Sequence, residues 1–466
     1  MDTAPLFDQP LTTSTPEPSS ADTEAAPRPG LKKTKVGWIP EAWEVRRMTE
    51  IVDSVSAGRS VGGRDANIED GEKGVLRTSA VTSGLFLPAE HKVVDPEDHE
   101  RLKLSPRSGD ILFNRANGSL DLVGISVRVK KDRPNLFLSD KLWRIQPGSD
   151  TSGQWLHYAL KSDRVIDYIR TYAGQKSTGM KNIAQRDFLT IPTPVPPRSE
   201  QRRIAGVLST WDRALQQIDD LIAAKERRKK ALMQQLLTGQ TRLPGFEGAP
   251  WHKQQIGDHF EYFSNRNKGD KDLTILSCSK VYGIVPQADR FDKRIASKDI
   301  SNYKIVEQGD LIYDPMLLWD GSIGFLNAVE KGVVSPAYYT FHFQGDELDQ
   351  QFFRYLFQSH YMKYQYGAIS QGTNARRKKA PRGAFLDIEV HLPQKEERHA
   401  IANILSTCDE ELELLRTERQ ALQKQKKGMM QKLLTGAVRV PADHSVDTVS
   451  KHETDHQTST AYRPRN

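Results

Sequence analysis

The stretch FLTIPTPVPPRSEQRRIAGVLSTWDRALQ (residues 188–216) occurs twice in this chain. Its second copy, FLDIEVHLPQKEERHAIANILSTCDEELE (385–413), lies 197 positions later, and the match continues without a gap from ALMQQLLTGQTRLP (231–244) to GMMQKLLTGAVRVP (428–441). Of the 57 aligned positions, 23 carry the same residue. A match of this length indicates an internal duplication, which any prediction of the fold has to satisfy.

Looser landmarks repeat earlier in each half. LRTSAVTSGLF (76–86) corresponds to LSCSKVYGIVP (276–286), and GDILFNRANGS (109–119) corresponds to GDLIYDPMLLWDGS (309–322), at a shift near 200. Between these landmarks the two halves diverge freely. We therefore expect two related halves that share a framework and differ between its fixed points.

The duplicated segments have the apolar spacing of a coiled coil. Apolar residues recur at alternating steps of four and three, rather than at the 3.6-residue period of a globular helix. Pro197 and Pro393 precede the two segments, and Gly239 and Gly436 follow them, which predicts helices of about 40 residues. The predicted pairing seam contains Ile204, Leu208, Trp211, Leu215 and Ile218 in the first helix, and Ile401, Leu405, Leu412, Leu415 and Leu433 in the second.

A lone helix of this length, polar on most faces, is marginal in water, so its apolar seam needs a partner. The duplicate supplies one, because two copies separated by a domain can pair antiparallel and hold the two intervening domains apart. Lys229 and Lys426 occupy aligned positions in this seam. The pair is either a device that sets the register of the helices or a solvated gap.

The segments between the repeats mix short strands and turns with a closing helix. This pattern predicts an α+β fold, with two α/β domains separated by two long antiparallel coiled-coil helices and related by a pseudo-two-fold internal repeat. Both ends of the chain are rich in Ser, Thr, Pro and acidic residues and are expected to be disordered. The predicted organisation is an N-terminal tail (1–35), a first domain (36–197), a central helix (198–241), a second domain (242–393), a C-terminal helix (394–437) and a C-terminal tail (438–466).

Composition excludes several classes of protein. The formal net charge is +7, a basic bias that fits a polyanionic partner without requiring one. Cys278 and Cys408 lie far apart without Cys or His neighbours at metal spacing, so we expect no disulfide framework, no structural zinc and a reducing, cytoplasmic location. No apolar run approaches the roughly 18 residues of a membrane span, so no membrane partner is expected.

Motifs for catalysis are also missing from the sequence. YAGQKST (172–178) resembles a phosphate-binding loop, but that loop needs Gly where this chain has Arg170 and Gln175. DPML at Asp314 lacks the second Pro and the aromatic residue of an amino-methyltransferase loop, and no GxGxxG precedes a helix to hold adenosylmethionine. We therefore expect a protein without catalytic residues, metal or cofactor of its own.

Two basic loops occupy equivalent places in the two halves. Each combines cations and amides with small hydroxyl residues and a Gly, which is the chemistry that contacts phosphates and reads base edges. An ordinary solvated loop is the alternative reading, and the run KERRKK (225–230) is likewise either a solvated helical face or a track for the DNA backbone. The candidate DNA-binding residues are Arg77, Arg115, Lys176, Ser177, Thr178, Lys181 and Asn182 in the first half, and Lys280, Thr373, Asn374, Arg376, Arg377, Lys378 and Lys379 in the second.

The repeated motifs resemble those of a known family. PVPPRSEQRRIAGVLSTWD with LLTGQTRLPG, duplicated as HLPQKEERHAIANILSTCD with LLTGAVRVPA, is similar to the conserved regions of the specificity subunits of Type I restriction-modification systems. The resemblance covers residues 37–441. The second copy departs from the family's Glu-Gln pair, because it has Glu397 and Arg398 where the first has Glu200 and Gln201.

The resemblance implies a non-enzymatic reader of double-stranded DNA. Two target-recognition domains would each bind one half of a bipartite site, and the paired helices would dock two copies of a DNA adenine methyltransferase subunit together with restriction subunits. Those partners would bring adenosylmethionine, ATP and magnesium, so no cofactor is assigned to this chain. Because the two domains differ in sequence, we expect an asymmetric site with an unread gap. Two rival interpretations are a coiled-coil scaffold that binds only proteins and a stand-alone restriction enzyme, which would need the catalytic and cofactor motifs that the sequence lacks.

Overall fold

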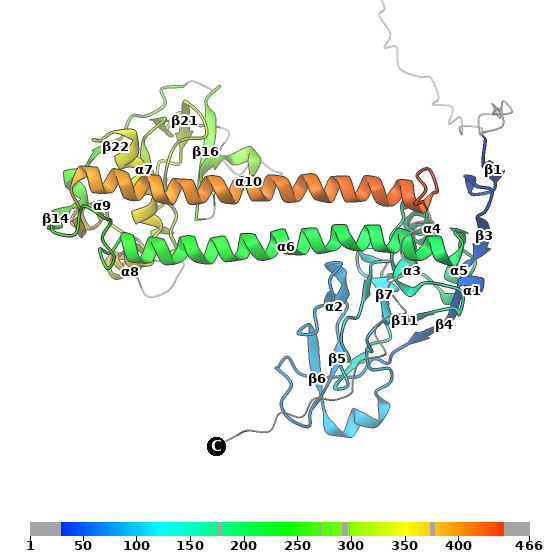
Figure 1. Cartoon of the computed structure of the whole chain (residues 1–466). Coiled ribbons are helices and arrows are strands. Elements are labelled where there is room, and N and C mark those ends of the chain that lie inside the picture. The colour runs from blue at the N-terminus through cyan, green and yellow to red at the C-terminus, as the bar shows by residue number, and fades with distance from the viewer. Residues whose placement is uncertain are drawn as a thin grey trace, which may run out of the picture. The chain divides into compact units, whose positions relative to one another are not determined.

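The computed structural model describes residues 29–174, 179–269, 272–280, 282–290, 297, 299–372 and 378–441 (Figure 1). The chain divides into two compact units: the first unit is Met1–Arg213 with Gln423–Asn466, and the second unit is Ala214–Leu422. Two long helices, α6 (Arg198–Leu236) and α10 (Lys395–Leu434), contribute one part to each unit. Helices and sheets occur together in both units, which confirms the predicted α+β class.

The first unit contains two main sheets. Its four-stranded sheet has the order β4-β11-β7-β9 and is antiparallel throughout. Its three-stranded sheet has the order β10-β5-β6, in which β10 runs parallel to β5. The strands are β4 (Val52–Ala57), β5 (Lys73–Leu76), β6 (His91–Val94), β7 (Ile111–Asn114), β9 (Ser126–Arg128), β10 (Leu136–Leu138) and β11 (Leu142–Pro147).

Smaller elements complete the first unit. Three short strand pairs are β1 (Leu31–Thr34) with β2 (Gly37–Pro40), β3 (Glu44–Arg47) with β13 (Pro192–Val195), and β8 (Ala116–Asn117) with β12 (Lys181–Asn182). The strand β1 lies within the predicted N-terminal tail. The helices are α1 (Met48–Ile51), α2 (Ser79–Thr82), α3 (Gly153–Ala159), α4 (Asp163–Gly174) and α5 (Gln185–Leu189), with 3-10 turns η1 (Pro96–Arg101) and η2 (Leu120–Leu122).

The second unit repeats this plan. Its antiparallel four-stranded sheet has the order β15-β22-β19-β20, and a second sheet has the order β17-β16-β21-β18. The strands are β14 (His252–Gln255), β15 (Phe260–Phe263), β16 (Thr274–Ser279), β17 (Gly283–Pro286), β18 (Lys304–Glu307), β19 (Leu311–Tyr313), β20 (Ile323–Phe325), β21 (Lys331–Val334), β22 (Tyr339–Phe343) and β23 (Glu389–Leu392). The helices are α7 (Glu347–Gln358), α8 (His360–Ile369) and α9 (Arg382–Leu386), with turns η3 (Ile256–Asp258), η4 (Gln287–Asp289) and η5 (Leu318–Asp320).

Equivalent aromatic pairs hold the cores of both units. In the first unit the rings of Phe113 and Phe188 lie 5.3 Å apart, and in the second unit those of Tyr313 and Phe385 lie 4.8 Å apart. Each pair joins a central strand, β7 or β19, to the short helix that precedes the repeated segment. The landmarks that aligned loosely in sequence therefore occupy the same place in the two cores.

The long helices pair antiparallel within each unit. In the second unit Arg419 pairs with Asp219, Arg416 with Glu226 and Lys225 with Glu411, so residue numbers fall along one helix as they rise along the other. The apolar positions of the predicted seam differ in burial, and half-buried residues lie between buried ones along the first helix. Buried seam residues are Ile204, Leu208, Ile218, Ile401, Leu405, Leu412 and Leu433, and half-buried ones are Trp211, Leu215 and Leu415.

Candidate functional site

The two aligned lysines of the seam form equivalent ion pairs. In the first unit Lys426 pairs with Asp212, which also accepts a hydrogen bond from the Tyr158 hydroxyl. In the second unit Lys229 pairs with Asp409, which accepts a 2.7 Å hydrogen bond from Tyr355. Lys229, Asp409 and Tyr355 are the residues that the repeat predicts from Lys426, Asp212 and Tyr158. Paired in this way, the lysines fit the interpretation that they set the register of the helices.

Both clusters contain a tyrosine whose pKa is raised by burial. Burial, strengthened by the hydrogen bond to Asp212, raises the pKa of Tyr158 far above its ordinary value. The pKa of Tyr355 is raised in the same way, by burial and by its hydrogen bond to Asp409. Both tyrosines therefore remain protonated donors to a carboxylate at any physiological pH. Each cluster fastens a closing helix of its unit, α3 or α7, to one of the long helices.

A second pair of equivalent clusters surrounds a buried carboxylate at the start of each long helix. Glu200 is 2 % exposed, accepts a 2.9 Å hydrogen bond from the Trp43 indole and pairs with Arg439. Glu397 is 1 % exposed. It accepts hydrogen bonds from the Trp251 indole at 3.2 Å and from Arg242 at 2.7 and 2.8 Å. A guanidinium and an indole donor offset the cost of burying each carboxylate.

The Gln201 and Arg398 positions, where the two repeats differ, lie in matching environments. Gln201 accepts a 2.8 Å hydrogen bond from the backbone N–H of Ser152 and donates to the Pro196 carbonyl at 2.9 Å. Arg398 donates to the Asp349 carboxylate at 2.7 Å and to the Pro393 carbonyl at 3.0 Å. Asp349 is the repeat equivalent of Ser152. The exchange of Gln for Arg is thus accompanied by an exchange of Ser for Asp on the facing element.

The run KERRKK on α6 is partly engaged by α10. Lys225 lies 2.7 Å from Glu411, and Lys229 pairs with Asp409 as described above. Arg227, Arg228 and Lys230 are exposed. Glu226 also pairs with Arg416, so three of the six residues hold the helices together. The exposure of the other three fits both interpretations, a solvated face and a track for the DNA backbone.

In the first unit, three of the candidate DNA-binding residues come together beside β7. Lys181 and Asn182 form β12, which pairs with β8 so that Asn182 faces Ala116 and Lys181 faces Asn117. Arg115 precedes β8 directly, and its carbonyl accepts a 3.0 Å hydrogen bond from the Ile183 N–H. The Arg115 side chain donates to the Asp140 carbonyl at 2.7 Å. These contacts fix a polar loop tip at the end of the central strand.

Arg77 lies apart from this group in the chain, at the junction of β5 and α2. Its guanidinium pairs with Asp65, and its side chain is 35 % exposed. Lys176, Ser177 and Thr178 lie outside the described residues.

In the second unit, the candidate residues surround the turn η5. Lys280 lies 2.9 Å from Asp320, and the Lys378 ammonium lies 5.4 Å from the ring centroid of Trp319. Lys379 forms an isolated bridge with Gln371, with backbone hydrogen bonds of 2.8 and 3.0 Å. Lys280 and Lys378 therefore flank one loop tip. The remaining candidates, Thr373, Asn374, Arg376 and Arg377, lie outside the described residues.

The candidate loops of both units are connected to the central sheet in the same way. In the first unit the N–H of Ile183 donates to the carbonyl of Arg115, and in the second the N–H of Ala380 donates to the carbonyl of Pro315 at 2.9 Å. Ile183 and Ala380 are equivalent in the repeat, and each follows a candidate basic loop. The residues that directly follow the two loops therefore make the same backbone contact, while the role of the loops stays a prediction.

The apolar residues of the second tip are not among the site residues predicted from the sequence. Met316, Leu317 and Trp319 lie in the segment DPMLLWDG, whose first residues resemble an incomplete methyltransferase motif. Met316 is 39 % and Leu317 42 % exposed. The signal available in the sequence was the alignment of this segment with GDILFNRANGS, which already contained the candidate Arg115.

One acidic group in the second unit has the spacing of metal ligands. Ligand atoms of Asp346, Asp349 and His399 lie within 4.8 Å of one another. Lys395 pairs with Asp346 at 2.8 Å, and this hydrogen bond lowers the pKa of that carboxyl to about 2. Arg398 pairs with Asp349 at 2.7 Å. Fixed cations therefore already satisfy both carboxylates, which does not favour a metal ion here.

A cavity of about 500 Å³ opens in the first unit, where α3 and α4 meet β13 and the end of α10. Trp155, Arg164, Tyr168 and Gln431 are among its lining residues.

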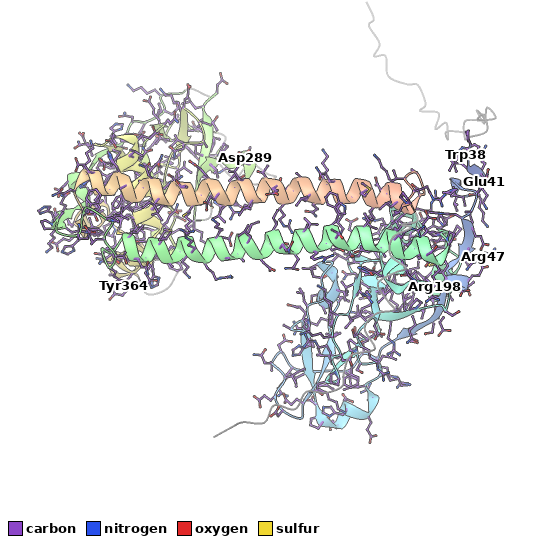
Figure 2. All side chains as sticks on the ribbon, viewed as in Figure 1. Trp38, Glu41, Arg47, Arg198, Asp289 and Tyr364 are labelled. Carbon is purple, nitrogen blue, oxygen red and sulfur yellow. The ribbon has the colours of Figure 1, made fainter. Side chains whose placement is uncertain are left out.

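Figure 2 labels Arg47 and Arg198, which lie in the same unit near the start of α6. Of the helices in the described part of the chain, none has the length and apolar character that a membrane crossing requires.

Comparisons with known proteins agree with one another. Residues 40–224 match the family described as Type I restriction modification DNA specificity domain. The chain is 25 % identical over 437 residues to the Type I restriction enzyme MjaVIII specificity subunit of Methanocaldococcus jannaschii, covering 86 % of this chain and 94 % of that protein. It is 27 % identical over 191 residues to the Type I restriction enzyme EcoEI specificity subunit of Escherichia coli, covering 41 % of this chain and 32 % of that protein.

Solved structures share the fold. The Type I restriction-modification system S subunit from M. genitalium is 14 % identical, with a TM-score of 0.50, over 84 % of this chain and 96 % of its own. A chain from a study of complex assembly and conformational transition of the type I R-M system is 16 % identical, with a TM-score of 0.54, over 86 % of this chain and 99 % of its own.

Proposed function

We propose that the two units of this chain read the two unlike halves of a bipartite DNA site. The chain belongs to the specificity subunits of Type I restriction-modification systems, which are the non-catalytic components that recognise target DNA. The observation that carries the proposal is a shared scaffold with unlike tips. β7 and β19 are equivalent strands, yet β7 leads into Arg115 and Asn117, whereas β19 leads into Met316, Leu317 and Trp319. Two different base-reading surfaces on one scaffold select two different sequences.

The equivalent helix clusters support a role in assembly. Two copies of one partner need two surfaces that offer the same contacts, and a pseudo-two-fold repeat provides them. The buried Glu200 and Glu397 clusters repeat the same carboxylate, indole and guanidinium at the starts of the two long helices, so the surfaces above them rest on equivalent frameworks. We therefore propose that this chain docks two copies of a DNA adenine methyltransferase subunit, and that restriction subunits join the same cytoplasmic assembly. Adenosylmethionine would be bound by the methyltransferase subunits.

The proposal for DNA reading is tested by changing one tip alone. In the complex with methyltransferase subunits, Arg115→Ala should weaken binding of the cognate site about tenfold and relax the choice of base at one position of one half-site only. Arg186→Ala is the matched control, because Arg186 is a cation of the same unit whose side chain is 88 % exposed on α5. Binding is measured by titration against every single-base variant of the site. Equal effects of both variants, spread over both half-sites, would contradict the proposal.

The alternative function, a coiled-coil scaffold that binds only proteins, makes a different prediction. It expects no sequence-dependent mobility shift of DNA, with or without methyltransferase subunits. Basic residues shortly precede Ile183 and Ala380, the residues that bond to Arg115 and Pro315, and this repeated placement favours DNA reading over the alternative.

A further inference from the structure

The loop between β19 and β20 presents apolar side chains on a fixed backbone. The Asp314 side chain accepts a 2.9 Å hydrogen bond from the Met316 N–H, and its carbonyl accepts a 3.1 Å bond from the Leu317 N–H. The Trp319 indole N–H donates to the Met316 carbonyl at 3.0 Å. The polar groups of this turn are thus used internally, so Met316 and Leu317 are held on the outside by the turn's own geometry.

Cations surround this apolar tip. Lys280 and Lys378 contact Asp320 and Trp319 of the same turn, as described above. Lys363 on α8 also approaches it, since a Cβ added at Gly321 would lie 3.4 Å from the Lys363 Cε. Tyr364, the next residue, is exposed and labelled in Figure 2. Apolar side chains ringed by lysines fit a DNA groove, in which phosphates flank the edges of the bases.

Two apolar interactions with DNA are open to such a tip: contact with the thymine 5-methyl group in the major groove, and insertion between base pairs as a wedge. A wedge has to protrude by the thickness of a base step. Met316 and Leu317 are 39 % and 42 % exposed, so more than half of each residue's surface is covered by its own unit. One face of the Trp319 ring is covered by Lys378, which leaves that face unable to stack on a base. Partly seated aliphatic groups suit lateral contact with a methyl group.

The geometry points to Met316 and Leu317 as residues that read thymine in the half-site bound by the second unit, through its 5-methyl group. This inference rests on the proposed function. The first unit has Arg115 and Asn117 at the equivalent tip and reads by hydrogen bonds. The two half-sites are therefore distinguished by the chemistry of reading as well as by sequence.

The test replaces thymine by deoxyuridine, which removes only the methyl group. In the full complex bound to its cognate site, one such replacement in the second unit's half-site should weaken binding about three- to tenfold, the loss expected for one buried methyl contact. The double variant Met316→Ala/Leu317→Ala should bind thymine and deoxyuridine sites equally. Leu85→Ala is the matched control, because Leu85 is 61 % exposed but lies in the first unit, and it should keep the discrimination.

Several results would overturn the inference. Equal binding of thymine and deoxyuridine at every position of this half-site would exclude a methyl contact, as would discrimination that survives in the double variant. A rise in 2-aminopurine fluorescence that depends on Leu317, without any effect of deoxyuridine, would establish the wedge instead. Failure of the complex to bind any specific site would be a different outcome, because it would remove the proposed function and not merely this mode of reading.

Discussion

The clusters that hold the long helices and the tips that end the central strands have diverged to very different extents. Glu200 and Glu397 keep the same indole and guanidinium partners, and Asp212 and Asp409 keep the same lysine and tyrosine partners. The tips share almost no side-chain chemistry, because one is polar and the other is apolar. The difference fits the two roles proposed above: the helix clusters keep the framework of the two halves alike, and the tips supply the chemistry in which the halves differ.

The reason lies in how the contacts are made. Each helix cluster joins residues far apart in the chain, such as Arg439 and Glu200, so a change of one partner leaves the other buried and unpaired. At the second tip, by contrast, Met316 and Leu317 are exposed and come from one short segment, so that a change of either side chain leaves no buried polar group unpaired. Where the starts of the two long helices differ, Gln201 against Arg398, the change is accompanied by a change of the partner residue.

Gln201 faces Ser152 in the first unit, whereas Arg398 faces Asp349 in the second. Changing only one member of such a pair should produce the largest loss of stability. Gln201→Arg alone places a guanidinium in a site that is 2 % exposed without a carboxylate, and we expect the free energy of unfolding to fall by about 3 kcal/mol. Adding Ser152→Asp should restore about 1 to 3 kcal/mol, because Asp supplies the missing carboxylate and also caps α3 as Ser does. A double-mutant cycle measured by chemical denaturation gives the coupling directly.

The matched control for this cycle lies in the second unit. Arg398→Gln with Asp349→Ser should be less costly than either change alone, since together they recreate the neutral arrangement of the first unit. If the two changes add within about 0.5 kcal/mol in both units, the exchange is not a coupled one.

A smaller effect on stability is expected at Lys161, because the second half has Gln358 at the equivalent position. Burial, together with the charge of Lys426, lowers the pKa of Lys161 to about 8. The unfolded chain then binds more protons than the folded one between pH 8 and about 10.5, so stability rises with pH across this window. Relative to Lys161→Gln, the wild-type chain should be less stable by about 1 to 3 kcal/mol at pH 7, and the gap should narrow by pH 9.5. Denaturation at both pH values measures it, and a gap that does not change with pH would contradict the buried charge.

The repeat made the helices and the equivalent loops predictable. A 197-residue offset fixes Lys229 and Lys426 as equivalents without coordinates, and the spacing of apolar residues identifies the seam. The same alignment brought Arg115, Lys181 and the second basic loop into view. Those inferences depend only on periodicity and on duplication, both of which are properties of the sequence itself.

The side-chain contacts of these residues in three dimensions were not predictable from the sequence. Nothing in KERRKK says that Lys225 meets Glu411 and leaves Arg227 exposed, because that choice depends on the register of two helices. The apolar tip was missed for a related reason: Met316 and Leu317 read as core residues in a sequence, and only the turn geometry of η5 turns them outward.

The central claim is that two unlike units on a symmetric scaffold read an asymmetric bipartite site. Sequencing of methylated adenines in a host that carries the complete system, with and without this gene, tests it most directly. We expect a gapped motif whose two halves differ, methylated only when the gene is present. A palindromic motif, or a methylation pattern that does not change when the gene is removed, would contradict the claim.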